Sequence, residues 1–113
     1  TYGKYHWTSR EKGYEQGFGK QVLGETWVAH HGEHKKEGTR GLVAKGEEKH
    51  PILKGIEANS IFGTTDVYTV KLPLKDCTPL VMGEVTETLK PDSKAVSGKK
   101  NAPMMPVGWT KTY

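Results

Sequence analysis

Hydrophobic positions fall in short clusters that are separated by polar and glycine-containing stretches, without a long amphipathic period. Several clusters have the β-branched or aromatic content of strands. The predicted strands cover residues 26–29, 39–45, 66–70, 79–86 and 104–110. The run Leu80-Val81-Met82 is typical of a strand that is buried on both faces. Pro106 predicts an edge position for the last strand because proline cannot donate a ladder hydrogen bond.

Only two short helical segments are predicted. Phe18, Val22 and Leu23 are spaced for two helical turns within residues 17–24, and glycines bound that segment. Pro51 suits the first position of a helical turn that ends near Gly55. We interpret His50, directly before that proline, as a turn cap. Residues 1–16, 30–38, 46–49 and 90–100 are predicted to be loops or turns.

The composition indicates one small folded domain with a thin core. The chain has 113 residues, of which 34% are hydrophobic and 27% charged, and its mean hydropathy is −0.69. No run of about 18 apolar residues is present, so no membrane-spanning helix is predicted. The single Cys77 cannot form an internal disulfide, which leaves the redox compartment open.

The positive charge does not predict a nucleic-acid partner. The net charge is +4 and the isoelectric point is about 9.1. The only arginines are Arg10 and Arg40, and the lysines are dispersed. Nucleic-acid sites need clustered basic residues, with arginine for most base contacts. We therefore interpret the charge as a solvated basic surface.

The densest cluster of candidate chemistry is the HHGEH sequence at residues 30–34, which follows Glu25. Histidine and carboxylate side chains suit zinc-like metals, yet the sequence lacks the H-E-x-x-H order of a metalloprotease helix. Three interpretations stay open, namely a metal site, the lining of a ligand site and a solvated polar loop. We assign no metal or other cofactor, and expect any metal binding at these histidines to be weak and incidental.

Asp66 and Tyr68 form a second candidate, since side chains two residues apart share one face of a strand. A carboxylate and a phenol can orient a hydroxylated ligand, although a strand end beside a capped turn is an equal alternative. Trp109 is a core residue or a sugar-stacking platform, and the same alternatives apply to Trp7 and Trp27. Cys77 lacks the glycine-flanked elbow that exposes a catalytic nucleophile.

Four blocks in order resemble ThuA-like (trehalose-utilisation-type) domains of secreted proteins from environmental bacteria. The first is GFGKQVLGETWV at residues 17–28 with HHG at 30–32. The second is HPILKGI at 50–56, and the third combines IFG at 61–63 with DVY at 66–68. The fourth combines GKKN at 98–101 with PMMPVGWTK at 103–111. Together the blocks span nearly the whole chain.

The resemblance implies an α/β fold of the flavodoxin-like kind, related to class I glutamine amidotransferases. Such domains are about twice this length, so the resemblance implies that residues 1–113 form a single partial domain whose sheet is incomplete in this chain. On that basis we expect strands that lack neighbours, and in particular exposed apolar surface at residues 80–82.

The resemblance also implies a role in carbohydrate utilisation, on a sugar or a modified disaccharide. His30, His31 and Asp66 are then the candidate catalytic residues, and His34, Tyr68 and Trp109 the candidate substrate-binding residues. The alternative is a non-catalytic carbohydrate-binding or protein-interaction module.

Further expectations concern partners and location. Because open α/β sheets bind ligands at strand ends, we expect the 30–34 histidines to face the same cleft as Asp66 and Tyr68. The expected partner is a carbohydrate or other small molecule, together with the rest of the domain or an oligomer partner, and neither nucleic acid nor membrane. A periplasmic or secreted location is favoured over a cytoplasmic one.

Overall fold

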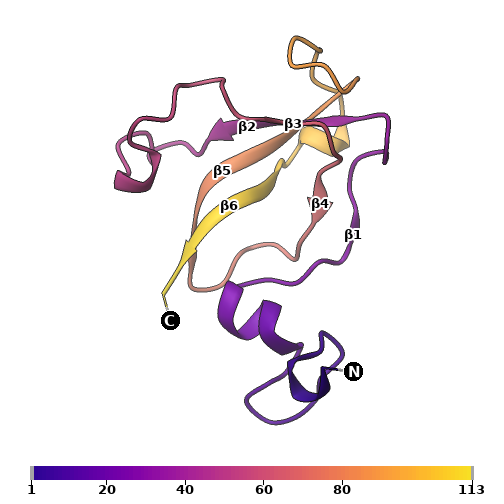
Figure 1. The fold of residues 1–113 in the computed structure, drawn as a ribbon, viewed down its shortest axis with the longest axis vertical. Coiled ribbons are helices and arrows are strands. Elements are labelled where there is room, and N and C mark those ends of the chain that lie inside the picture. The colour runs from indigo at the N-terminus through magenta and orange to yellow at the C-terminus, as the bar shows by residue number, and fades with distance from the viewer. Residues whose placement is uncertain (1, 113) are drawn as a thin grey trace.

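A computed structural model describes residues 2–112, which form two antiparallel sheets (Figure 1). The larger sheet has four strands in the order β3-β2-β5-β6. Its strands are β2 (Gly38–Val43), β3 (Phe62–Gly63), β5 (Cys77–Thr86) and β6 (Met105–Lys111). The smaller sheet pairs β1 (Ala29–His30) with β4 (Tyr68–Thr69). β6 lies at an edge of the larger sheet, as Pro106 predicted.

Two glycines that face each other in the larger sheet leave room for side chains of neighbouring strands to pack directly against the backbone. Gly41 of β2 lies opposite Gly83 of β5. A Cβ atom added at Gly83 would lie 2.6 Å from the side chain of Val107 and 3.2 Å from that of Thr39. Glycine is therefore required at Gly83 for close packing, because any larger residue would displace its neighbours.

The helical segments are short. Residues 2–112 contain the 3₁₀ turns η1 (Gly3–Tyr5), η3 (Pro51–Leu53) and η4 (Lys99–Asn101) and the π-helical segment η2 (Gly19–Leu23). The helix predicted around residues 17–24 is thus present as a single wide turn. His50 caps η3 as interpreted from the sequence, because its Nδ1 accepts a hydrogen bond of 3.2 Å from the backbone N–H of Ile52.

The expected flavodoxin-like α/β fold is wrong. That fold requires parallel strands joined by crossover connections of about a dozen or more residues that usually contain an α-helix. Every strand pair in residues 2–112 is instead antiparallel, and the helical segments have three to five residues. The cause lies in the connecting segments. They are rich in glycine, proline and charged residues, and they carry no apolar stripe that could hold a helix against a sheet.

The hydrophobic core is thin, as the composition predicted. Its centre consists of Val67, Val70, Val85 and Met105, and three partly buried residues pack against it: Leu74, Val96 and Trp109. The radius of gyration is 15.1 Å, which exceeds the value of about 13 Å for a compact chain of roughly 100 residues. The N-terminal segment with η1 and η2 extends away from the sheets and lengthens the molecule (Figure 1).

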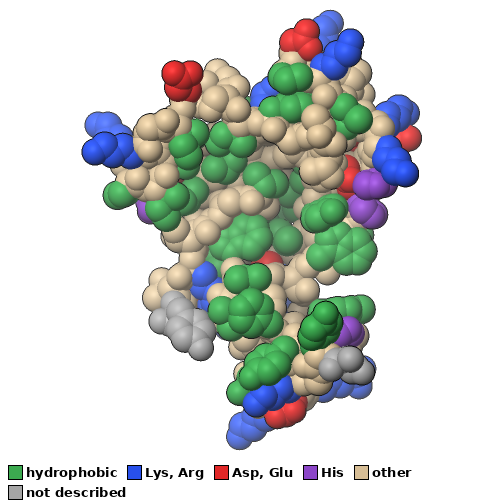
Figure 2. All heavy atoms as spheres, viewed as in Figure 1, with side chains coloured by type: hydrophobic (Ala, Val, Ile, Leu, Met, Phe, Trp, Pro, Cys, Tyr) green, Lys and Arg blue, Asp and Glu red, His purple; other side chains and the backbone are tan. Residues whose placement is uncertain are grey.

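The expectation that residues 80–82 would lack a neighbouring strand is wrong. They lie in β5, which pairs with β2 on one side and with β6 on the other, and Leu80 is buried. Exposed large hydrophobic residues lie elsewhere, at Trp7, Leu23, Trp27, Val28, Ile52 and Tyr68 among others. Figure 2 shows hydrophobic side chains gathered across the middle of one face of the molecule.

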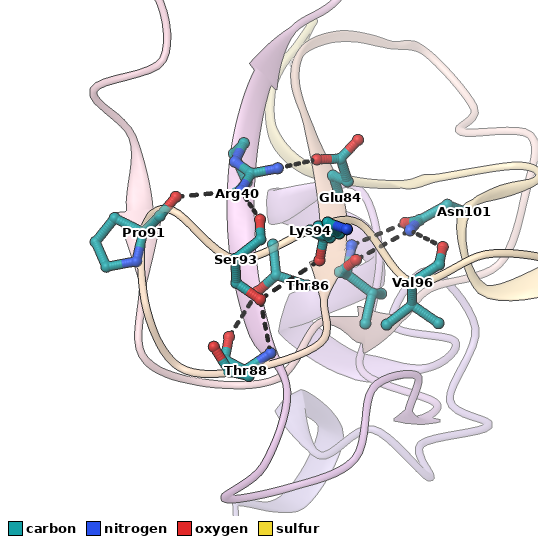
Figure 3. A network of polar contacts seen from close by, with 10 residues as sticks. Arg40, Glu84, Thr86, Thr88, Pro91, Ser93, Lys94, Val96 and Asn101 are labelled. Atoms are coloured by element: carbon teal, nitrogen blue, oxygen red, sulfur yellow. Dashed lines mark hydrogen bonds and ion pairs between the residues drawn. The ribbon is translucent and has the colours of Figure 1, made fainter.

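A polar network fixes the segment between β5 and β6 against the larger sheet (Figure 3). Arg40 donates to Glu84 over 2.6 Å and also to the backbone carbonyls of Pro91 and Ser93. The Asn101 side chain accepts from the backbone N–H of Val85 over 2.8 Å and donates to the carbonyl of Val85 over 3.0 Å and to that of Val96 over 2.8 Å. These bonds anchor η4, whose Lys100 reaches the candidate site.

Across residues 2–112, no helix has the length and apolar character needed to cross a membrane.

Candidate functional site

The pairing of β1 with β4 brings the histidine segment to Asp66. His30 lies opposite Tyr68 in this ladder, and the backbone N–H groups of His31 and Gly32 both donate to the carbonyl of Val67, over 2.8 and 3.1 Å. The chain next to His30 therefore runs alongside the residue that follows Asp66. This non-local pairing creates the site, and nothing in either segment alone requires it.

Asp66 binds two histidines through its two carboxylate oxygens. Oδ2 lies 2.6 Å from Nδ1 of His30, and Oδ1 lies 2.8 Å from Nδ1 of His34. The Asp66 side chain has no exposed surface, whereas the His30 and His34 side chains are 50% and 55% exposed. A buried carboxylate thus holds two imidazole rings at the surface.

Hydrogen bonding keeps Asp66 ionised despite its burial. Burial by itself raises the pKa of Asp66, but the hydrogen bonds from His34 and His30 and from its own backbone N–H outweigh burial, and the pKa lies below its ordinary value. An ionised carboxylate only accepts hydrogen bonds, so each Nδ1 carries the proton that it donates. In the neutral form of either ring, the Nε2 atom is then left as an acceptor.

A tight turn returns His34 to the carboxylate. The backbone N–H of Glu37 donates to the carbonyl of Glu33 over 2.9 Å, and the Glu37 carboxylate accepts from the backbone N–H of Glu33 over 2.6 Å. Gly32 lets the chain pass close above Asp66. A Cβ atom at Gly32 would lie 3.1 Å from Cβ of Asp66 and 3.3 Å from Oε2 of Glu37, so a side chain there would crowd both residues.

His31 points away from this cluster. Its Nε2 atom lies 2.6 Å from the backbone carbonyl of Lys100, and Nζ of Lys100 pairs with Glu37 at 2.7 Å. Burial by itself raises the pKa of Glu37. The hydrogen bonds from Lys100 and from the backbone N–H of Glu33 outweigh this effect, so the pKa of Glu37 lies below its ordinary value. These contacts tie the histidine loop to η4 and give His31 a positioning role.

A cavity of about 480 Å³ lies between the two sheets and adjoins Asp66. This volume is within the range of small-molecule sites. Asp66, Tyr68 and Trp109 line it, and His30 and His34 lie outside its wall. The other lining residues are mostly apolar and include Trp27, Phe62, Val67, Val70 and Pro106. The cavity therefore offers an apolar surface with few polar groups.

Two half-exposed aromatic rings stand beside His30. The Trp27 ring centroid is 5.7 Å from that of His30 and 6.4 Å from that of Tyr68, and both pairs meet edge to face. The Tyr68 ring is 5.6 Å from His30. Trp27 and Tyr68 are 52% and 48% exposed, so each keeps an open ring surface.

The structure unites most of the residues that the sequence analysis selected. His30, His34, Asp66 and Tyr68 lie together. Trp109 lines the cavity farther along, where its Nε1 donates to the carbonyl of Leu23 over 2.6 Å. His31 faces η4 instead. The sequence analysis left Trp27 open as a core residue or a sugar-stacking platform and did not place it among the candidate site residues. It did not select Glu37 and Lys100, whose pairing spans 63 residues.

Comparisons of this chain with protein families, with curated proteins and with solved structures found no match.

Proposed function

We propose that this chain binds a carbohydrate, or a similarly hydroxylated small molecule, at the surface formed by Trp27, Tyr68, His30 and His34. The observation that carries the proposal is the pair of half-exposed aromatic rings around a histidine whose orientation a buried carboxylate fixes. Aromatic rings pack against the C–H faces of a sugar, and a few oriented polar groups recognise its hydroxyls. The Nε2 atoms of the two half-exposed histidines would accept hydrogen bonds from those hydroxyls.

The sequence resemblance to ThuA-like proteins supports a sugar as the ligand class. The resembling blocks contain three residues of the proposed surface, Trp27, His30 and Tyr68, and also the Asp66 that orients His30. Since the fold that the resemblance implies is not the fold of this chain, the resemblance contributes only the expected ligand and no mechanism.

A specific observation favours acid–base catalysis as a second candidate function. Asp66 accepts from Nδ1 of His30 over 2.6 Å, so the opposite nitrogen can take a proton from a bound hydroxyl while the carboxylate stabilises the resulting imidazolium. His34 shares the same carboxylate and offers a second acceptor. In this scheme Asp66 orients the rings and His30 carries the proton.

Saturation-transfer NMR with glucose, maltose and trehalose tests the binding proposal. We expect transfer to the sugar C–H protons in the wild-type chain and its loss in Trp27→Ala, because the main packing surface is removed. Trp7→Ala is the matched control, since Trp7 is also exposed, at 62%, and lies in the N-terminal segment away from the site. Absence of transfer with all three sugars, or equal transfer in Trp27→Ala, contradicts the proposal.

Hydrolysis of p-nitrophenyl glycosides tests the catalytic candidate separately. We expect turnover by the wild-type chain that is lost in His30→Ala and retained in His6→Ala. Sugar binding without turnover would restrict the function to recognition.

A further inference from the structure

Three potential metal ligands converge at the histidine cluster. One ligand atom each from His30, His34 and Asp66 lies within 4.8 Å of the other two. We propose that these residues bind a divalent transition ion of the zinc class, through one nitrogen of each imidazole and the Asp66 carboxylate. The proposal rests on this geometry and is independent of the proposed carbohydrate function.

The distances suit a cation between the rings and the carboxylate, because each neutral imidazole can carry its proton on Nε2 and leave Nδ1 free as a ligand. The two Nδ1 atoms lie 2.6 and 2.8 Å from the oxygens of Asp66. Around a zinc ion with ligand bonds of about 2.0–2.1 Å, neighbouring ligand atoms in a tetrahedron are separated by about 3.3 Å. Each Nδ1 atom would therefore have to move away from its Asp66 oxygen by about 0.5–0.7 Å to reach that spacing. Their 50% and 55% exposure allows this movement.

The ligand chemistry selects a borderline metal. Two imidazoles with one carboxylate are a ligand set for zinc and neighbouring divalent ions, whereas calcium and magnesium prefer oxygen ligands alone. Three protein ligands also leave coordination positions for water or another molecule, as at catalytic zinc sites. Asp66 supplies the negative charge that the histidines lack, and its burial protects that charge from screening by salt.

The sequence analysis expected only weak metal binding because it considered the HHGEH loop without Asp66. A loop that holds only two converging imidazoles would bind a metal weakly. The β1–β4 ladder adds the third ligand from 32 residues away. The Glu33–Glu37 turn and the Lys100–Glu37 pair then hold the loop in place, which lowers the entropy that is lost on binding.

Titration of the metal-free chain with Zn²⁺ by calorimetry, and with Co²⁺ by visible absorption, tests the proposal. We expect one ion per chain with micromolar or tighter affinity. The visible absorption of bound Co²⁺ should be that of a four-coordinate ion. His34→Ala should weaken binding by more than about 100-fold, which exceeds the 10–100-fold cost of changing an outer-shell partner. His6→Ala is the control, because His6 lies in the N-terminal segment, where its Nδ1 contacts Thr8 rather than Asp66, and this substitution should leave the zinc affinity unchanged.

Asp66→Asn tests whether the carboxylate is a metal ligand, because a site made of the two histidines alone would keep its zinc affinity in this variant. Circular dichroism establishes whether the variant folds. Full zinc affinity in folded Asp66→Asn, or in His34→Ala, overturns the proposal, and so does the absence of one-to-one binding by the wild-type chain. Because His34 is exposed, its variant remains informative even if Asp66→Asn does not fold. Repeating the sugar experiment in EDTA keeps the two proposals distinct, since sugar binding without metal leaves the carbohydrate proposal intact.

Discussion

His30 and Tyr68 face each other across the β1–β4 ladder, with their ring centroids 5.6 Å apart at an interplanar angle of 71°. The same pairing places His30 on Asp66, which lies two residues before Tyr68. A change that disturbs the path of the chain after β1 should therefore disturb the aromatic rings and the carboxylate together.

Gly32→Val should destabilise the chain by about 1–3 kcal/mol, the usual cost of overpacking. A side chain at Gly32 would meet Asp66 Cβ at 3.1 Å and the Glu37 carboxylate at 3.3 Å. Gly63→Val is the control, because its nearest neighbour would be 3.8 Å away. Urea unfolding measures both. An equal effect of the two substitutions would show that the loop above Asp66 can move aside.

Stability in acid should depend on Asp66. Its pKa in the folded chain is lowered, so its contribution is fully present above the unfolded-state pKa of about 3.9 and is lost as the pH falls through the lower folded-state pKa. Asp66→Asn should therefore reduce stability at neutral pH and flatten the loss of stability below about pH 4. Urea unfolding across pH 2–7 checks this, with exposed Asp92→Asn as the control. An unchanged acid slope in Asp66→Asn would contradict it.

Arg40→Lys should destabilise the chain by about 1–3 kcal/mol, since hydrogen bonds to charged groups contribute that much. The Arg40 guanidinium donates to Glu84 and to two backbone carbonyls, and its side chain is only 21% exposed. A single ammonium cannot reproduce this fork. Arg10→Lys, at the other arginine, which is exposed, is the control and should be nearly neutral. Chemical denaturation of both variants gives the comparison.

Asn101→Asp should destabilise the chain by about 2 kcal/mol or more, because two donated hydrogen bonds are replaced by a carboxylate that faces the carbonyls of Val85 and Val96. Hydrogen exchange at the Val85 amide should accelerate with it. The other asparagine provides the control, since Asn59 is exposed and Asn59→Asp should leave exchange at Val85 unchanged. Exchange at the Val85 amide as slow in Asn101→Asp as in the wild-type chain would show that the network of Figure 3 does not fix residues 88–101 against the larger sheet.

Local sequence signals located several elements correctly. The predicted strands at 39–45, 79–86 and 104–110 correspond to β2, β5 and β6, and the predicted cap at His50 is present. These features depend on side-chain branching, on proline and on hydrogen bonds between residues close in sequence. Each of these features depends on residues that are close together in the sequence, so it can be predicted without knowledge of the tertiary structure.

The order and direction of the strands could not be obtained in that way. The sequence resemblance implied parallel strands with covering helices, whereas every strand pair in residues 2–112 is antiparallel. For the site, the sequence determined which residue types are present, namely the histidines of residues 30–34, Asp66 and Tyr68. Only the tertiary structure decided that His30 and His34 share the buried Asp66 carboxylate while His31 turns to Lys100. The reason is physical: a ladder between segments more than thirty residues apart depends on the packing of the whole chain, which no local pattern encodes.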